Sequence, residues 1–389
     1  MVEPTTVLYA LVGAVGLLGA DAYYNSSTIH VETSVAPVYE SNGYNHKVVE
    51  AIFAGELKKI ADVNSVTGQL DFATSIHKPL GKALAEAAGL SSFFQAAKTA
   101  AGIEHTTILL SVVVDSKDGK SIPRIVVAGD THGTSHFNLT IPLAESTSVD
   151  MSLAEAAFRA MTEINPYIAA LYAFERAAKN GVHPVEADRL VEEWIENGPT
   201  NVYSPERALF ENLGGLSSLI DGDTASAEMW FQKSSKSDPE LGPATINLAF
   251  MSLYKGYFVR AVELLEPVTQ ESLWPSSVDD RIIYAAHVGL GIALSGLGKI
   301  EESDSQFADA AKLKPDGVSV YYYWARSLLK QNRAAEAKSL LETSQRNAKQ
   351  IVNLPELVSL YFWLPDEPNG PLERRTKNLP KMLTQLMAP

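Results

Sequence analysis

The chain contains no cysteine. This absence excludes disulfide bonds, thiolate metal sites and cysteine nucleophiles, and it leaves the redox compartment undecided. Basic residues are also scarce, because 32 lysines and arginines stand against 46 aspartates and glutamates and give a formal net charge of −14. An acidic chain is poorly matched to a polyanion, so we expect no nucleic-acid partner. The length of 389 residues predicts two or three domains.

An uninterrupted apolar run lies near the N-terminus, from Val7 to Ala20, with Tyr23 and Tyr24 just beyond it. Its length predicts one transmembrane helix over residues 6–24, inside an N-terminal anchor of residues 1–25. A cleaved signal peptide is one alternative, although residues 1–6 lack the lysine or arginine that such a peptide normally carries. A buried core helix is the other. The anchor predicts a single-pass membrane protein.

Residues 26–150 show a mixed pattern that predicts a small antiparallel α+β domain. A strand is expected at 28–38, because β-branched residues alternate there with polar ones, and further strands are expected at 106–114, 124–128 and 136–141. The turn at 115–120 contains Gly119 and has the composition of a hairpin. Helices are expected at 47–62, where apolar residues form one stripe, and at about 78–101.

After residue 165, small residues and prolines recur with a period of 34. Four units begin at Ala208, Gly242, Tyr284 and Val318, and a degenerate earlier unit begins at Ile168. Positions 8 and 20 of the four units hold Gly215 and Ala227, Ala249 and Ala261, Gly291 and Ser303, and Ala325 and Ala337. Position 24 holds Phe231, Leu265, Phe307 and Leu341, and position 32 holds Pro239 and Pro315 in two units. Ser303 departs from the small apolar residue expected at position 20.

This pattern resembles the tetratricopeptide repeat, in which each unit is a pair of antiparallel helices. The small residues let the two helices approach closely, the larger residue at position 24 fills the contact with the next unit, and the proline ends the second helix. The sequence therefore predicts an α+β N-terminal module followed by an all-α tetratricopeptide solenoid, with one N-terminal transmembrane helix. We assign residues 151–347 to the repeats and 348–389 to a C-terminal capping segment.

In the solenoid that this resemblance implies, positions 2, 5, 9 and 12 of each unit face a concave groove. The candidate partner-binding residues at these positions are Asn212, Leu216, Ile246, Phe250, Leu253, Val288, Ile292, Tyr322 and Arg326. They are mostly apolar, which favours a helical or extended apolar protein segment as the ligand. The alternative is that several of them are buried by the middle domain or by the capping segment.

One motif points to a different class of function. The run from Gly129 to Gly133 places Asp130 and His132 after a predicted strand and resembles the first metal-binding motif of calcineurin-like phosphoesterases. His136 is a possible third ligand, but the further motifs of that family do not follow. A polar hairpin turn is the simpler interpretation, and we expect no metal, no cofactor and no enzymatic activity.

The order of an apolar span, a Gly43-Tyr44 helix module, a small sheet and repeats also resembles bacterial single-span tetratricopeptide proteins. That resemblance implies a periplasmic location for most of the chain and a role as a scaffold, subunit or assembly factor of a membrane complex. Two alternatives stay open: a metal-dependent phosphohydrolase centred on Asp130 and His132, and a soluble secreted adaptor.

Overall fold

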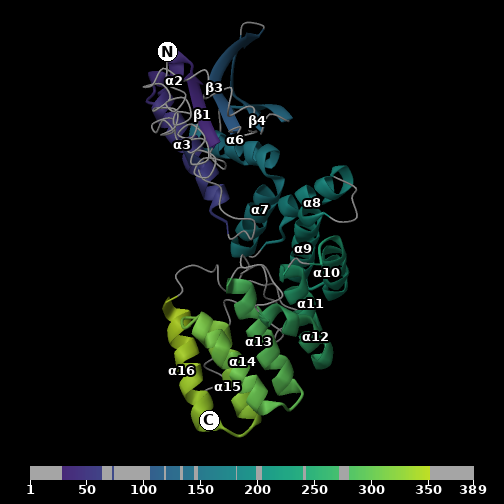
Figure 1. Cartoon of the computed structure of the whole chain (residues 1–389). Helices are drawn as coiled ribbons and strands as arrows, with labels where there is room; N and C mark the ends of the chain where they lie inside the picture. The colour runs from purple at the N-terminus through teal and green to yellow at the C-terminus, as the bar shows by residue number, and fades with distance from the viewer. Residues whose placement is uncertain are drawn as a thin grey trace, which may run out of the picture. The chain divides into compact units, whose positions relative to one another are not determined.

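The computed structural model describes residues 29–63, 72–73, 106–117, 120–131, 135–143, 148–180, 182–198, 204–239, 242–270 and 280–350. Figure 1 traces the chain from its α+β elements to its helical repeats. The chain divides into two compact units, residues 1–169 and 170–389.

The first unit contains a five-stranded sheet in the order β2-β1-β3-β4-β5. Its strands are β1 (Ile29–Val35), β2 (Phe72–Ala73), β3 (Thr106–Lys117), β4 (Lys120–Thr131) and β5 (Ser135–Pro142). The hairpins β3-β4 and β4-β5 are antiparallel, as predicted, but β1 pairs parallel to both β2 and β3. The expectation of an antiparallel sheet is therefore wrong for β1. Alternation marks a strand but not its direction, and the long connection from β1 to β3 permits a parallel crossover.

Two long helices cover one face of this sheet. Helix α3 (His46–Ala61) contacts β1, α6 (Val149–Ile164) contacts β4 and β5, and the two helices contact each other. Asn45 caps α3 and Ser148 caps α6, because each side chain accepts a hydrogen bond from a backbone N–H of the first turn. Between these helices and the sheet lie fully buried side chains such as Phe53, Leu110 and Leu153. Helix α6, although assigned to the repeats from sequence, thus packs with the sheet.

The remaining elements of the first unit are short or lie outside the description. Helix α2 (Pro37–Glu40) follows β1 directly, so the strand expected at 28–38 ends at Val35. The helix predicted at about 78–101 lies outside the described residues. Helix α7 (Pro166–Asn180) spans the division between the two units.

The second unit continues with successive helices that pack in antiparallel pairs (Figure 1). Helix α8 (Val185–Asn197) packs on α9, with Trp194 stacked on Phe210 at 4.6 Å between ring centroids. The four pairs are α9 (Pro205–Ile220) with α10 (Thr224–Ser237), α11 (Gly242–Tyr254) with α12 (Phe258–Thr269), α13 (Asp280–Gly296) with α14 (Ile300–Leu313), and α15 (Val318–Lys330) with α16 (Ala334–Gln350). The predicted tetratricopeptide-like helical architecture is confirmed.

The turn inside each pair uses one backbone device. Position 15 of the repeat has a positive φ in all four pairs, at Gly222, Gly256, Gly298 and Asn332. The backbone N–H of the next residue donates to a carbonyl five residues earlier, as in Lys299 N to Leu294 O at 2.9 Å and Arg333 N to Leu328 O at 3.0 Å. This arrangement satisfies carbonyls at the end of the first helix, and it requires a residue that tolerates the left-handed conformation.

No helix in the described part of the chain is long and apolar enough to cross a membrane. The predicted transmembrane helix, residues 6–24, lies outside the described residues. We therefore correct two predictions, namely a fold with an N-terminal transmembrane helix and a single-pass membrane protein whose bulk is periplasmic. Apolar length alone is weak evidence for a span of this marginal length, because buried helices carry similar runs.

We predict that Gly298→Ala lowers the free energy of unfolding by about 1 kcal/mol, because no atom crowds the new methyl group and the left-handed backbone alone opposes it. Gly298→Asn should cost less, since Asn332 occupies the equivalent position. Urea denaturation followed by circular dichroism measures both. Equal losses for the two variants would contradict this account of the turn.

Candidate functional site

In two of the helix pairs, a glycine of the first helix lies against a phenylalanine ring of the second. A Cβ atom built on Gly215 would lie 2.3 Å from Phe231 Cε1, and one on Gly291 would lie 2.7 Å from Phe307 Cε1. Positions 8 and 24 of a repeat thus touch within the same pair. The other two pairs hold an alanine with a leucine at these positions, Ala249 with Leu265 and Ala325 with Leu341, and all four side chains are buried.

Residues at position 24 also reach the next repeat, as predicted. Leu265 Cδ1 lies 2.6 Å from where a Cβ of Gly289 would be, and the ring of Phe307 stacks on Trp324 at 6.2 Å between centroids. A single large side chain therefore joins the two helices of its own pair and then the following pair. This double contact gives the stack its spacing.

Buried serines tie the second helix of a pair to the first. Ser234 donates to Ala208 O at 2.6 Å, and Ser344 donates to Val318 O at 3.0 Å from the equivalent position. Ser303, the departure at position 20, donates to Gly291 O at 2.7 Å. Its hydroxyl is thus satisfied in a place where a buried unpaired one would be costly.

We predict that Gly215→Ala costs about 1 to 3 kcal/mol of unfolding free energy, because the methyl group meets the Phe231 ring. The double variant Gly215→Ala with Phe231→Leu should recover most of that loss, since it recreates the alanine and leucine found in two other pairs. Chemical denaturation of the two single variants and the double variant forms the test. If the double variant loses as much unfolding free energy as the two single variants together, the sizes of residues 215 and 231 are not matched to each other.

The nine predicted partner-binding residues lie where the repeat numbering places them, on the first helices of the pairs, but most are enclosed. Asn212, Leu216, Ile246, Phe250, Leu253, Val288 and Tyr322 are buried, with exposed fractions of 5% or less. Ile292 and Arg326 are half-buried. The alternative, burial of several of them by the middle domain or by the capping segment, stays a prediction as to what covers them, and so does their role in binding.

Two contacts show what the enclosed residues do. Asn247 on α11 donates to Asn212 on α9 at 2.8 Å in the buried interior, which links two consecutive repeats. On α15, the guanidinium of Arg326 lies 5.8 Å from the ring centroid of Tyr322. The structure thus brings Tyr322 and Arg326 together, and it gives Asn212 a partner from the neighbouring repeat.

The metal-binding alternative falls on the β4-β5 hairpin. Asp130 pairs with His136 in the antiparallel register, and His132 lies outside the described residues. No group of three or more histidine, aspartate or glutamate residues that could hold a metal ion occurs among the residues that the structure describes. The absence of enzymatic activity stays a prediction.

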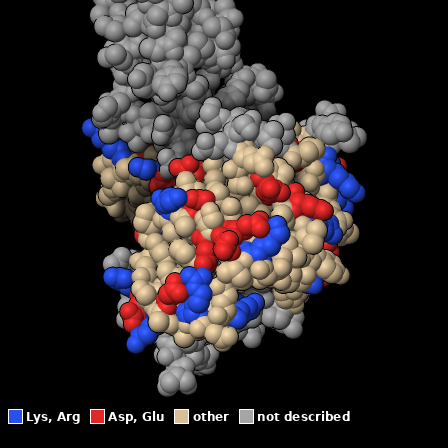
Figure 2. All heavy atoms as spheres, turned by 60° about the horizontal axis from the view of Figure 1, so that its bottom comes forward, with Lys and Arg blue, Asp and Glu red and all other residues tan. Residues whose placement is uncertain are grey.

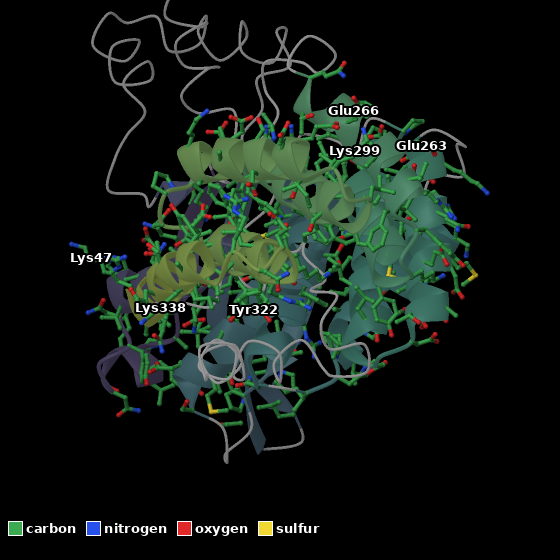
Figure 3. The ribbon with its side chains drawn as sticks, turned by 90° about the horizontal axis from the view of Figure 1, so that it is seen from below. Lys47, Glu263, Glu266, Lys299, Tyr322 and Lys338 are labelled. Carbon is green, nitrogen blue, oxygen red and sulfur yellow. The ribbon has the colours of Figure 1, made fainter. Side chains whose placement is uncertain are left out.

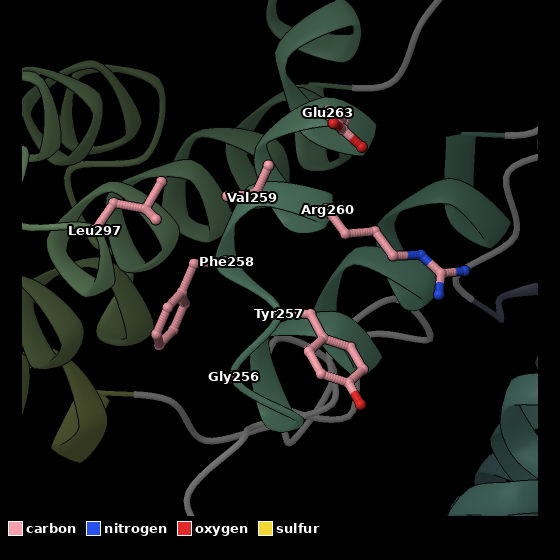
Figure 4. Close-up of a pocket in the computed structure, with 7 residues that line it drawn as sticks. All are labelled: Gly256, Tyr257, Phe258, Val259, Arg260, Glu263 and Leu297. Carbon is pink, nitrogen blue, oxygen red and sulfur yellow. The ribbon is translucent and has the colours of Figure 1, made fainter.

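A pocket that the sequence analysis did not predict lies at the edge of the stack, where the turn between α11 and α12 meets the end of α13 (Figure 4). Its volume is about 430 Å³. We call it the edge pocket, and its lining residues are Gly256, Tyr257, Phe258, Val259, Arg260, Glu263 and Leu297. Tyr257, Val259 and Leu297 are 57%, 58% and 40% exposed. Apolar side chains here face solvent.

The edge pocket forms because two repeats meet tightly below it. A Cβ on Gly296 would lie 2.6 Å from the Phe258 ring, so the glycine lets that ring settle against α13. In Figure 4, Phe258 and Leu297 lie on the α13 side of the pocket, and Tyr257 and Arg260 project from the opposite side. The pocket is thus a joint property of the second and third repeats.

The basic groups around the edge pocket lie close to carboxylates. Glu228 forms a salt bridge with Lys255 and lies 3.9 Å from the guanidinium of Arg260. Lys299 pairs with Glu302 at 3.1 Å. Figure 2 shows acidic and basic side chains interspersed over one face of the protein, with acidic ones gathered across its middle.

The start of α12 also lacks a helix cap. In the first pair, Asp223 accepts a hydrogen bond from Ser226 N at 3.0 Å, and hydrogen bonds with Ser226 hold the pKa of its carboxyl below the ordinary value. Tyr257 occupies the equivalent position of the second pair and forms no side-chain cap. A large exposed ring thus stands where a short polar side chain would stabilise the helix.

We predict that Tyr257→Asp raises the free energy of unfolding at pH 7 by about 0.5 to 1 kcal/mol, because the carboxylate caps α12. The pKa of a capping carboxyl is lowered in the folded state, so the gain should be present above the unfolded pKa and should vanish as the pH falls through the folded one. Tyr257→Ala is the control and should show no gain. Chemical denaturation at several pH values measures this gain in unfolding free energy. A gain that persists in acid would show that the carboxylate does not cap α12.

Comparison with known proteins adds three solved structures. No family model matches the chain, and no curated protein matches it. The solved structures are "MamA RS-1 ArsTM double mutant" (18% identity, 49% of this chain and 98% of that chain, TM-score 0.35), "MamA 41-end from Desulfovibrio magneticus RS-1" (19%, 49% and 98%, TM-score 0.36) and "MamA MSR-1 C2" (19%, 47% and 98%, TM-score 0.32). These similarities are too low to carry an argument, and the tetratricopeptide-like assignment rests on the helix pairs themselves.

Proposed function

We propose that this chain is a protein-binding scaffold and not an enzyme, and that the edge pocket is one of its docking sites. The observation that supports this proposal is the exposed apolar surface of Tyr257, Val259 and Leu297. Exposed apolar side chains that cluster around a pocket are typical of protein interaction sites.

The internal repeats provide a control for this interpretation, since equivalent positions share one structural task. Position 14 holds Asp221, Lys255, Leu297 and Gln331 in the four repeats, and position 16 holds Asp223, Tyr257, Lys299 and Arg333. Position 18 holds Ala225, Val259, Glu301 and Ala335. The stack therefore forms without bulky apolar residues at these positions. Their presence only at the junction of the second and third repeats supports a task other than folding.

The other functional predictions have less support. Membership of a membrane complex rested on the resemblance to bacterial single-span tetratricopeptide proteins and on the apolar segment of residues 7–20. That segment lies outside the described residues, so this part stays a prediction. A metal-dependent phosphohydrolase centred on Asp130 and His132 would need further ligands. His132 lies outside the described residues, and no observation in the described part of the chain favours this function.

Site-specific photocrosslinking in the source cells tests the docking site. A photoreactive phenylalanine at Val259 should yield a covalent adduct with another protein, because that side chain is 58% exposed beside the pocket. The same residue at Glu301 is the matched control, since Glu301 holds the equivalent position of the next repeat. The Val259 adduct should disappear when Leu297→Asp is added.

Two outcomes would count against the proposal. One is an absence of any protein adduct from Val259 under conditions in which the protein is folded. The other is a pattern of adducts that is the same for Val259 and Glu301, which would indicate random collisions.

A further inference from the structure

We propose that the edge pocket binds a basic amphipathic segment of a protein partner, with an apolar side chain in the pocket and lysines or arginines on the carboxylates of Glu263 and Glu266. This inference rests on the proposed function, and it adds the chemistry of the partner. It depends on one exposed stripe of α12 and on the balance of charge around it.

The stripe consists of Val259, Glu263 and Glu266, which are spaced four and then three residues apart. Residues at this spacing share one face of a helix. All three are exposed, and Val259 and Glu263 line the edge pocket. An apolar contact point thus continues directly into two acidic ones, over roughly 10 Å along the helix axis.

The two carboxylates, Glu263 and Glu266, form no ion pair within the described part of the chain. Arg260 and Lys255, in contrast, share Glu228, and Lys299 pairs with Glu302. In Figure 3, Glu263, Glu266 and Lys299 project from the same edge of the helical stack. Each local cation thus lies near a carboxylate other than Glu263 and Glu266, although Lys255 and Arg260 share one. With Glu263 and Glu266 included, four carboxylates stand against three cations, so the surface keeps a net negative charge.

Charge complementarity then decides the sign of the partner. The chain carries a net charge of −14, so an acidic partner would meet repulsion both at the stripe and over the whole molecule. A basic partner gains attraction from both. The length of the stripe, about two helical turns, fits a helix or a short extended segment whose apolar anchor is followed by basic residues.

The test uses the full chain and three fluorescently labelled synthetic peptides of about 18 residues. The first has leucines on one helical face and lysines on the other, the second replaces the lysines by glutamates, and the third replaces the leucines by serines. Fluorescence polarisation should show binding of the leucine and lysine peptide at low salt, weaker binding at about 0.3 M NaCl, and much weaker binding of the other two.

Matched variants locate the binding. The double variant Glu263→Gln with Glu266→Gln should lower the affinity for the leucine and lysine peptide about fivefold, as expected for the loss of two exposed charge pairs. Glu301→Gln with Glu342→Gln removes two exposed carboxylates elsewhere on the stack and is the control for net charge. It should leave the affinity nearly unchanged.

Each result has a defined meaning. Equal weakening by the two double variants, or equal binding of the lysine and glutamate peptides, overturns the basic partner. In either case, a crosslink that is specific to Val259 would still support the proposed docking function. Failure of that crosslink would overturn the docking function whatever the peptides do.

Discussion

The helical stack depends on the distance between the two helices of each pair. Two combinations of residues occur at positions 8 and 24: glycine with phenylalanine in two pairs, and alanine with leucine in the other two. The same large side chain then reaches the next pair, as Leu265 does at Gly289. Close packing within a pair and spacing between pairs are therefore one constraint, and the left-handed residue at position 15 brings the second helix back at the angle that this contact needs.

Sequence reasoning succeeded where the cause of structure is periodic. The 34-residue period located four helix pairs, because residues such as Gly291 and Phe307 are fixed by contacts inside one repeat. Strand direction escaped it, since the parallel pairing of β1 with β3 is set by a long connection and not by alternation. The transmembrane prediction, which rested on a run of marginal apolar length and its flanking tyrosines, is corrected, because no helix of the described part is long and apolar enough to span a membrane.

The candidate site shows a second limit. Residues predicted to line a groove, such as Phe250 and Val288, are buried, because position within one hairpin does not reveal what packs on it. The edge pocket brings together Phe258 and Leu297, which are about 40 residues apart in the sequence, so no local sequence motif predicts it. One signal was available: Tyr257, Val259 and Leu297 break the polar or small pattern of their equivalents in the other repeats.

The last helix has a feature with a wider consequence. On α16, the buried positions Ala337, Leu341 and Ser344 face α15, and the other side carries exposed polar residues, including Glu336, Lys338 and Glu342. An apolar outer side would offer a surface on which a further hairpin, or another molecule of the same kind, could add end to end. The capping segment predicted at 348–389 lies almost entirely outside the described residues. The described side of α16 that faces away from α15 is instead polar, so it is poorly suited to apolar end-to-end addition of this kind.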